Sequence, residues 1–568
     1  MLLRSGLDRL SSRLAEDESI FLDRTNHLVV QMSTASSIAA RKRMQAMIRA
    51  LVRTPLFAEG GPTHVDIGSA WTRLSGEIFT DASRMRDVSD QAELSLQHRD
   101  LVLRPGQRAK PRRKPDKAFI PLLAILSILV NFAVPLAIMM TLYLAGTDIS
   151  AFVYLGLVVV MFGMSLTQLA EGISASRKVA LPPVPDRPAP RATAIVAAYL
   201  PNEAATILET LRSVLSQQYS GGLQVILAYN SPTTLPVEDE LRAMAEKDPR
   251  LELIKVAFSR SKADNVNAAL AIVTGEFVGI FDADHHPMEG SFERAWRWFA
   301  DGVDVVQGHC VVRNGEESGI ARMIAIEFEQ IYAVSHPGRQ RLHKFGIFGG
   351  SNGYWRTQLL RETRLRSQFL TEDIDSSIRA VRQGARIIND PELISRELAP
   401  VTLSALWKQR MRWAQGWFEV SLRHGHSVVT ASGLGLRQRY GLWMLLGWRE
   451  IFPWVASLMW PTLAFFIWRD GGIDLVNAPA IFWLTTAFTL TTGPILILFA
   501  YRLGAPEIRA NRAWWWQYAL LSVIVYSEFK NVIVRVAQIR HVLGADEWVV
   551  TPRGRVEHRD ALNPATTG

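Results

Sequence analysis

Paired carboxylates in the second half of the chain could bind a metal ion. Asp282 and Asp284 follow the apolar run 277–281, and two histidines come directly after them. At the end of a buried strand, such a pair can hold a hard divalent cation, which neutralises a diphosphate leaving group. The alternative is a pair of surface-loop carboxylates with a structural role only.

A second acidic pair could act as a base. Glu372 and Asp373 follow the apolar residues Phe369 and Leu370 and precede a helical pattern. A carboxylate here could deprotonate an acceptor hydroxyl, which contributes about 10²–10⁴-fold when its pKa matches the working pH. The alternative is a helix N-terminus, with Thr371 as its cap and acidic residues in its first turn.

The segment Gln409-Arg410-Met411-Arg412-Trp413 combines a cation with an aromatic ring, and Trp407 and Trp417 flank it. The planar fork of Arg412 suits a diphosphate, and the indole of Trp413 can stack on a sugar ring. The alternative is an interfacial helix with aromatic and basic anchors.

The elements that position these groups follow from the pattern of apolar runs. Strands are predicted at 194–198, 223–228, 251–256, 277–281 and 303–307, and a helix at 203–215. Such alternation predicts an α/β domain with a mainly parallel sheet, which binds ligands at the carboxyl ends of its strands.

Apolar segments on both sides of this domain predict a polytopic membrane protein. The runs 118–144, 151–170, 451–468 and 480–501 are each span-like. Basic residues precede the first span and are absent from the linker 145–150, which places the domain and both termini in the cytoplasm. The segment 514–543 carries Glu528, Lys530 and Arg535, so we predict an interfacial helix, with a kinked fifth span as the alternative.

Composition excludes some classes of protein. Cys310 is the only cysteine of 568 residues, so an internal disulfide and cysteine-cluster metal sites are excluded. The net charge of +9 gathers beside the predicted spans, as in 110–117 and 502–512, which favours contact with anionic lipid over nucleic acid. The N-terminus lacks the apolar core of a signal peptide.

We predict the following order of domains, listed by residue number: a cytoplasmic helical region of unknown role at 1–107, two spans at 118–174, a proline-rich linker at 175–191, the α/β domain at 192–400, interfacial helices at 401–450, two spans at 451–503, an interfacial helix at 512–543 and a C-terminal segment at 544–568.

In this order the motifs resemble the processive, membrane-embedded members of glycosyltransferase family 2, such as cellulose, curdlan and hyaluronan synthases. The resemblance covers residues 192–553. It implies a GT-A-type catalytic domain inserted between transmembrane helices, located in a bacterial-type inner membrane.

The resemblance also implies roles for individual residues. Tyr199, Glu203, Asn230, Lys262, Asp264 and Asp282 would bind the nucleotide or donor, together with Gln409 and Arg412. Asp284 and His285 would bind Mg²⁺ or Mn²⁺, and Asp373, beside Glu372, would be the catalytic base. Phe348, Gly350, Ser351 and Trp413 would bind the acceptor, and Trp548, Val550, Thr551 and Arg553 look like a gating loop.

Two departures from the family pattern stand out. Asn230 occupies a position where the family has aspartate, which removes one charge from the nucleotide pocket. Glycine replaces cysteine in Ile347-Phe348-Gly349-Gly350-Ser351, so the floor of the acceptor site differs.

The leading hypothesis is an inverting enzyme that polymerises a hexose, with glucose preferred, from a UDP-sugar into a β-glucan. One alternative is a transferase that stops at a glycolipid, and another is a degenerate scaffold without activity. A growing glycan, the lipid bilayer, and a second copy or an export subunit are the expected partners.

Overall fold

The computed structural model describes residues 119–177, 180–256, 259, 261–472 and 480–543, together with short segments before residue 64. The chain divides into two compact units. Residues 1–111 make up most of the first unit, and residues 112–568 make up the second, apart from two short segments at 270–272 and 366–368.

The first unit contains strands as well as helix in its described residues. Helix α1 (Leu2–Ser11) is followed by two antiparallel hairpins, listed by their strands: β1 (Glu18–Leu22) with β2 (Leu28–Met32), and β3 (Leu56–Ala58) with β4 (Gly61–Thr63). The prediction of a helical region at 1–107 is therefore incomplete. Segments such as Leu28–Met32 contain adjacent valines, which favour strands.

An eight-stranded mixed sheet forms the centre of the second unit, in the order β7-β6-β5-β8-β11-β10-β12-β9. Its strands are β5 (Ala192–Tyr199), β6 (Leu223–Asn230), β7 (Leu251–Lys255), β8 (Phe277–Asp282), β9 (His286–Pro287), β10 (Val305–Val312), β11 (Gly353–Arg356) and β12 (Ile387–Glu397). Strands β5 to β8 pair in parallel, and β11 and β9 pair antiparallel to their neighbours. The sheet confirms the predicted α/β class.

The helices of the second unit are listed here in chain order: α4 (Phe119–Leu144), α5 (Ser150–Ala175), α6 (Leu200–Glu203), α7 (Ile207–Leu215), α8 (Val237–Lys247), α9 (Lys262–Ala269), α10 (Ser291–Ala300), η1 (Gly315–Glu317), α11 (Gly319–Phe328), η2 (Glu329–Ser335), α12 (His336–His343), α13 (Thr357–Thr363), α14 (Glu372–Arg382), α15 (Leu403–Thr430), α16 (Leu436–Trp443), η3 (Met444–Trp448), α17 (Arg449–Ser457), α18 (Met459–Asp470), α19 (Ala480–Leu503), α20 (Pro506–Ala510), α21 (Arg512–Leu521), η4 (Ser522–Tyr526) and α22 (Ser527–Val542).

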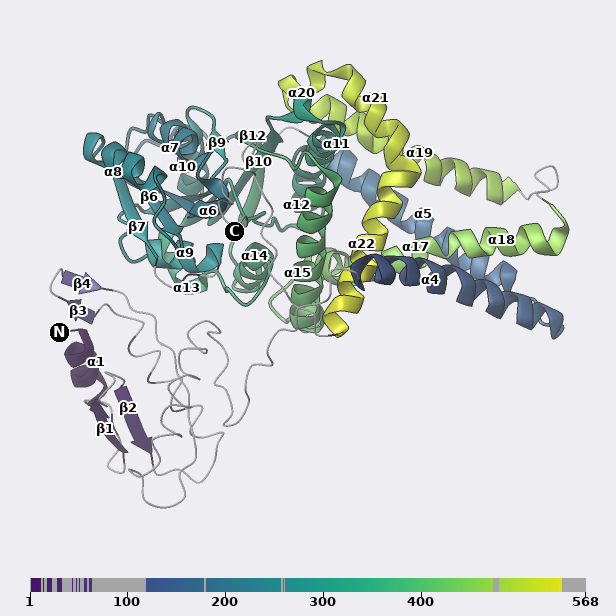
Figure 1. The fold of residues 1–568 in the computed structure, drawn as a ribbon, viewed down its shortest axis with the longest axis horizontal. Helices are drawn as coiled ribbons and strands as arrows, with labels where there is room; N and C mark the ends of the chain where they lie inside the picture. Colours follow the sequence, from purple (N-terminus) through teal and green to yellow (C-terminus); the bar gives the residue numbers. More distant parts are fainter. Residues whose placement is uncertain are drawn as a thin grey trace, which may run out of the picture. The chain divides into compact units, whose positions relative to one another are not determined.

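Two apolar cores hold these elements together. In the first, Leu211 of α7 and Phe292 of α10 pack with residues of β5, β6 and β8. In the second, Val311 of β10 packs with Ile324 of α11 and Ala500 of α19. The second core joins the sheet to the apolar helices, and Figure 1 shows α12 and α15 standing between them.

Three described helical stretches are long and apolar enough to cross a membrane, namely Pro121–Leu144, Ser150–Ala175 and Leu436–Asp470. The first two lie in the predicted spans. The third begins before the predicted 451, because α16, η3, α17 and α18 follow one another with hardly a break. The prediction at 480–501 lies in α19, whose Thr491–Leu503 portion is a shorter apolar helix.

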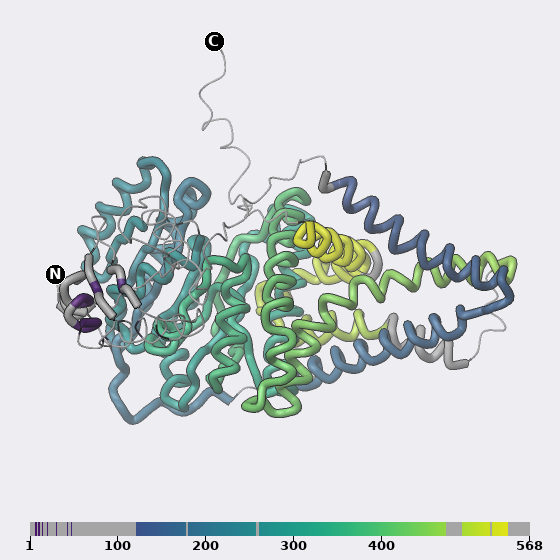
Figure 2. Tube along the Cα trace, turned by 90° about the horizontal axis from the view of Figure 1, so that it is seen from below, coloured from purple at the N-terminus to yellow at the C-terminus, as the bar shows by residue number. Residues whose placement is uncertain are grey.

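The segment predicted as an interfacial helix consists of α21, η4 and α22. Val532, Ile533 and Val536 of α22 are buried and pack against α15 and α4. Seen from below, in Figure 2, α4 and α18 lie side by side, and the two helices are in contact.

A close crossing fixes α12 on α5. A Cβ atom at Gly338 would lie 2.3 Å from the Glu171 carbonyl oxygen, so only glycine fits there. Arg341 donates a hydrogen bond of 2.7 Å to the Ser174 carbonyl near the end of α5, where helical carbonyls have no partner within the helix. This contact ties the sheet domain to an apolar helix.

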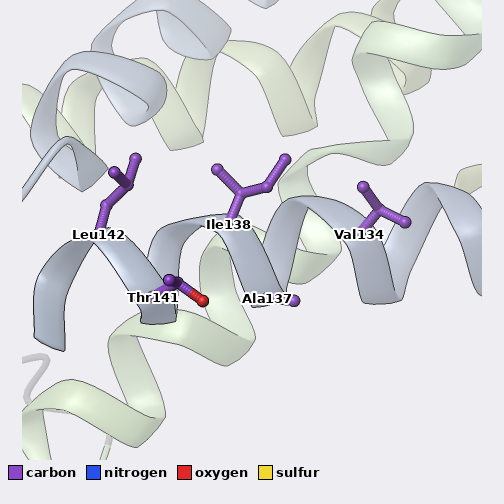
Figure 3. A pocket seen from close by; sticks show the side chains of 5 residues that line it. All are labelled: Val134, Ala137, Ile138, Thr141 and Leu142. Atoms are coloured by element: carbon purple, nitrogen blue, oxygen red, sulfur yellow. The ribbon is translucent and has the colours of Figure 1, made fainter. Parts of the chain in front are cut away.

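An open apolar groove of about 400 Å³ lies on α4, lined by Val134, Ala137, Ile138, Thr141 and Leu142. Figure 3 shows Val134, Ile138 and Leu142 along one side of the helix. Because these residues belong to a candidate span and carry no titratable group, we assign the groove to packing against lipid, not to chemistry.

Asp390 offers a test of the fold. Its buried carboxylate accepts hydrogen bonds of 2.7 Å from Arg294 Nε and from Trp298 Nε1. Asp390→Ala leaves the Trp298 indole N–H without this partner and leaves Arg294 paired with Glu392. We expect a loss of about 1–3 kcal/mol of stability, seen as a lower Tm of the detergent-purified protein.

Asp301→Ala is the matched control, because Asp301 and its partner Arg386 are 46% and 53% exposed. An exposed pair contributes about 0–1 kcal/mol, so the Tm of this variant should stay near that of the wild type. Equal losses of Tm in the two variants would show that the buried Asp390 contact contributes no more to stability than the exposed pair.

Candidate active site

Polar residues meet where β5 and β6 end. Tyr199 and Asn230 are paired at the last position of the two strands. Glu203 accepts a hydrogen bond of 2.8 Å from the Tyr199 amide. Asn265 of α9 donates to Asn230 Oδ1 at 3.0 Å and to the Ala198 carbonyl at 3.1 Å. The structure thus gathers three predicted nucleotide-pocket residues and adds Asn265, which the motifs did not single out.

Lys262 joins two predicted parts of the site. Its ammonium pairs with Asp282 at the end of β8 and donates a hydrogen bond of 2.6 Å to the Gly350 carbonyl. Burial alone would lower the pKa of Lys262, but the carboxylates of Asp282 and Glu372 raise it above its ordinary value. The side chain is therefore a fixed positive charge. Asp264 lies in the first turn of α9, where its amide donates to Ser261 Oγ at 3.1 Å.

Glu372 and Asp373 are the first two residues of helix α14. This position also agrees with the alternative prediction, in which the two acids lie in the first turn of a helix. Burial and then the Asp373 carboxylate raise the pKa of Glu372 to about 7. Burial raises the pKa of Asp373 to about 6, and the Ile374 amide and Lys262 oppose this rise. Because the two groups interact, they titrate as a pair. A carboxylate with such a pKa is suited to general base chemistry near neutral pH.

The predicted acceptor loop lies against the base. Gly350 has φ +95°, and a Cβ atom there would lie 3.0 Å from Asp373 Oδ2, so glycine allows the close approach. Ser351 Oγ accepts a hydrogen bond of 3.0 Å from the Asp282 amide. Phe348 is fully buried, and its amide donates to Ser377 Oγ at 2.8 Å. The loop therefore contacts both acidic segments.

The residues after β8 could hold a metal ion. One ligand atom each from Asp282, Asp284 and His285 lies within 4.8 Å of the others. Oxygen donors with one imidazole fit Mg²⁺ or Mn²⁺. Asp284 also accepts a hydrogen bond of 3.2 Å from the Leu398 amide. Burial would lower the pKa of His285, but Glu397, 2.5 Å away, raises it.

Helix α15 brings the segment 409–413 close to the acidic pair. A Cβ atom at Gly416 would lie 2.8 Å from the Thr371 amide nitrogen, so α15 crosses the start of α14 at close range. Arg412 is one turn before Gly416 on the same face. Its charge lowers the pKa of both Glu372 and Asp373. Gln409 is buried, and its Oε1 has no hydrogen-bond partner among the described residues.

Arg410, for which we predicted no role, anchors this helix. It pairs with Glu327 at 2.5 Å, and Lys530 and Tyr526 also bond to Glu327, at 3.1 and 2.8 Å. The Arg410 guanidinium lies 4.4 Å from the centre of the Trp413 ring, a cation–π contact. Apart from a second arginine in the segment, nothing in the sequence pointed to this role.

The predicted gating residues Trp548, Val550, Thr551 and Arg553 lie outside the described residues. The other predicted site residues lie in described parts of the second unit. Contacts join most of them at one edge of the sheet, whereas the Trp413 ring packs on Arg410 and Phe328. The role of each residue stays a prediction.

Comparison with known families gives this geometry a context. Residues 277–469 match the family model "Glycosyl transferase family group 2". This match covers about a third of the chain, from β8 to α18, and shows similarity to a glycosyl transferase family 2 domain there. The mixed, mostly parallel sheet is that of a GT-A glycosyltransferase fold.

Curated relatives match part of the chain at low identity. The poly-beta-1,6-N-acetyl-D-glucosamine synthase of Staphylococcus epidermidis is 26% identical over 268 residues, which is 46% of this chain and 60% of the relative. The synthase of the same name from Staphylococcus aureus (strain COL) is 25% identical over 286 residues, 47% of this chain and 62% of the relative. The matches thus span about three fifths of the relatives' length.

Solved structures are also similar to the transferase. A mannosyltransferase from Pyrobaculum calidifontis in complex with GDP-Man and Mn²⁺ matches 70% of this chain and 100% of its own, with 20% identity and a TM-score of 0.47. Staphylococcus aureus TarS residues 1–349 in complex with UDP-GlcNAc match 62% of this chain and 92% of their own, with 12% identity and a TM-score of 0.31.

The contact of α15 with α14 predicts the effect of two glycine substitutions in one helix. In Gly416→Ala the new Cβ would meet Thr371, so we expect a lower Tm and weaker sugar transfer as Arg412 moves from the acidic pair. In the control Gly425→Ala the Cβ meets open space, and alanine in a helix is favoured by about 0.5–1 kcal/mol. Thermal unfolding and turnover of both variants check this, and normal turnover by Gly416→Ala would contradict it.

Proposed function

We propose that this chain is an inverting glycosyltransferase that moves a hexose from a UDP-sugar to the end of a growing β-glycan. The observation that carries the proposal is the position of Lys262. Its ammonium bridges Asp282, on the predicted diphosphate side, and the Gly350 carbonyl, beside the predicted base Asp373. The residues proposed for the leaving group and for the attacking hydroxyl, Asp282 and Asp373, therefore lie next to each other.

The donor would lie over the ends of β5, β6 and β8. Tyr199, Asn230 and Asn265 offer the base and ribose a ring and amides. Arg412 and Lys262 offer the diphosphate positive charge, and Gln409 offers it a buried amide. A divalent cation held by Asp282, Asp284 and His285 would neutralise charge on the departing UDP.

In the reaction, Asp373 accepts the proton of the acceptor hydroxyl while the oxygen attacks the anomeric carbon. The bond to UDP breaks as the new glycosidic bond forms, so the single displacement inverts the configuration. Burial keeps the pKa of both carboxylates high, and Lys262 and Arg412 oppose this effect. With a pKa of about 6, Asp373 is largely deprotonated at neutral pH.

Several features favour a polymer. Trp413 sits on the helix that faces the acidic pair, where its ring can receive the terminal sugar of a chain. The curated relatives are named as synthases of an N-acetylglucosamine polymer. UDP-N-acetylglucosamine therefore joins UDP-glucose as a donor to be tested. We propose that the polymer leaves through the membrane helices, with a second copy or another subunit completing the path.

Two carboxylate substitutions test the proposal on protein purified in detergent with Mn²⁺ or Mg²⁺ and a panel of labelled UDP-sugars. Asp373→Asn removes the base, and we expect kcat to fall about 10²–10⁴-fold. Asp284→Asn removes one carboxylate of the proposed metal site. We expect this variant to need a much higher concentration of Mn²⁺ or Mg²⁺ for half-maximal turnover. Asp239→Asn is the control, because that side chain is 76% exposed and pairs with the exposed Arg242. Normal polymer from both site variants would refute the assignment.

The acidic pair also predicts the pH dependence. A base whose pKa is raised is protonated, and therefore inactive, below that pKa. We expect kcat/KM to rise with pH through the range of about 6 to 7 set by Asp373 and Glu372.

Glu372→Gln removes the member of the pair whose pKa is about 7, so the rise should follow Asp373 alone and lie at lower pH, at about 6. Initial rates between pH 5 and 8 measure the shift in both proteins. An identical profile in the two would contradict this account of the pair.

A further inference from the structure

A second group of metal-ligand side chains lies beside the predicted Mg²⁺ or Mn²⁺ position. Strands β10 and β12 pair in parallel, with Cys310 opposite Ser395. Side chains two residues apart on a strand share a face, so Glu397 lies on the same face as Ser395. His285, from the loop after β8, places Nδ1 3.2 Å from Ser395 Oγ and Nε2 2.5 Å from Glu397 Oε2.

One ligand atom each from His285, Cys310 and Glu397 lies within 4.8 Å of the others. His285 is fully buried, and its Nε2 faces the Glu397 carboxylate at 2.5 Å. Cys310 is buried as well, and its Sγ donates a weak hydrogen bond of 3.9 Å to the Ser351 carbonyl. A buried imidazole, a thiol and a carboxylate thus converge within reach of one ion.

We propose that His285, Cys310 and Glu397 form a binding site for a thiophilic divalent cation of the Zn²⁺ class. Imidazole, thiolate and carboxylate are the ligands that Zn²⁺ takes, and three protein ligands leave a fourth position for water. The Glu397 side chain is 17% exposed and gives the ion a route to the site.

The ligand set also matches the charge of the ion. A thiolate is the form of cysteine that binds metal, so binding would release the Cys310 proton to solvent. One thiolate and one carboxylate would then offset the two positive charges of the ion.

The ligand chemistry separates this position from the one at Asp282 and Asp284. Two carboxylates there favour a hard ion, whereas sulfur favours a soft one. The two positions share His285, so an ion bound to Cys310 takes one ligand from the other. If the proposed function holds, Zn²⁺ therefore inhibits the transferase.

Co²⁺ spectroscopy tests the site on the full chain in detergent, without activity. A thiolate bound to Co²⁺ absorbs strongly in the near ultraviolet, and Cys310 is the only cysteine of the chain, so the wild type reports on this residue alone. We expect one equivalent of Co²⁺ to produce the band and one equivalent of Zn²⁺ to remove it. Titration with Co²⁺ that never produces the band would overturn the proposal.

Variants assign the other ligands. Glu397→Gln should weaken the band at limiting Co²⁺, and Cys310→Ser should abolish it, while Asp284→Asn should retain it. Loss of the band in Asp284→Asn with full retention in Glu397→Gln would place the ion elsewhere.

Inhibition gives a separate test that depends on the proposed function. Zn²⁺ should lower Mn²⁺-supported sugar transfer by the wild type, and Cys310→Ser should be less sensitive. Equal sensitivity would refute the sharing of His285. A chain that shows the Co²⁺ band but transfers no sugar would refute the proposed function and leave the metal site intact.

Discussion

Repulsion between crowded carboxylates is the constraint on which this site depends. Asp282, Asp284, Glu372 and Asp373 meet at one edge of the sheet. Two like charges 4 Å apart repel by about 4 kcal/mol near a protein surface, so the group needs positive partners. Lys262 supplies one of them by direct contact with Asp282. Arg412 supplies a second charge from α15. A divalent cation completes the set in the proposed function.

The scaffold holds these charges through close contacts that only small residues permit. Gly350 lets the acceptor loop approach Asp373, and Gly416 lets α15 approach Thr371. On its other side α15 is held by Arg410, whose partner Glu327 also binds Lys530 and Tyr526. Burial would raise the pKa of Glu327, but Arg410 and Lys530 lower it to about 2. The anchor therefore stays charged at all working pH values.

The sequence predicted the α/β sheet and the gathering of its polar strand ends, because apolar runs followed by Asn230 or Asp282 carry a local signal. Helix α14 was also predictable from the acids that follow Thr371, but the predicted cap is not formed, because the Thr371 hydroxyl makes no capping hydrogen bond. Contacts between distant segments carried no such signal. Glu327 and Arg410 are 83 residues apart, and Asn265 and Asn230 are 35 apart, so only the folded chain reveals these pairs. The β-hairpins of the first unit were missed because short strands and helices share similar apolar patterns.

The stereochemistry of the first product tests the central claim most directly. A single displacement assisted by Asp373 converts the α-linked sugar of a UDP-sugar into a β-linked product. NMR of the initial product from the purified chain should therefore show the large anomeric coupling of a β-linkage, before any later rearrangement. An α-linked initial product would contradict the account, since retention requires a double displacement through a covalent intermediate or attack from the same face as the leaving UDP.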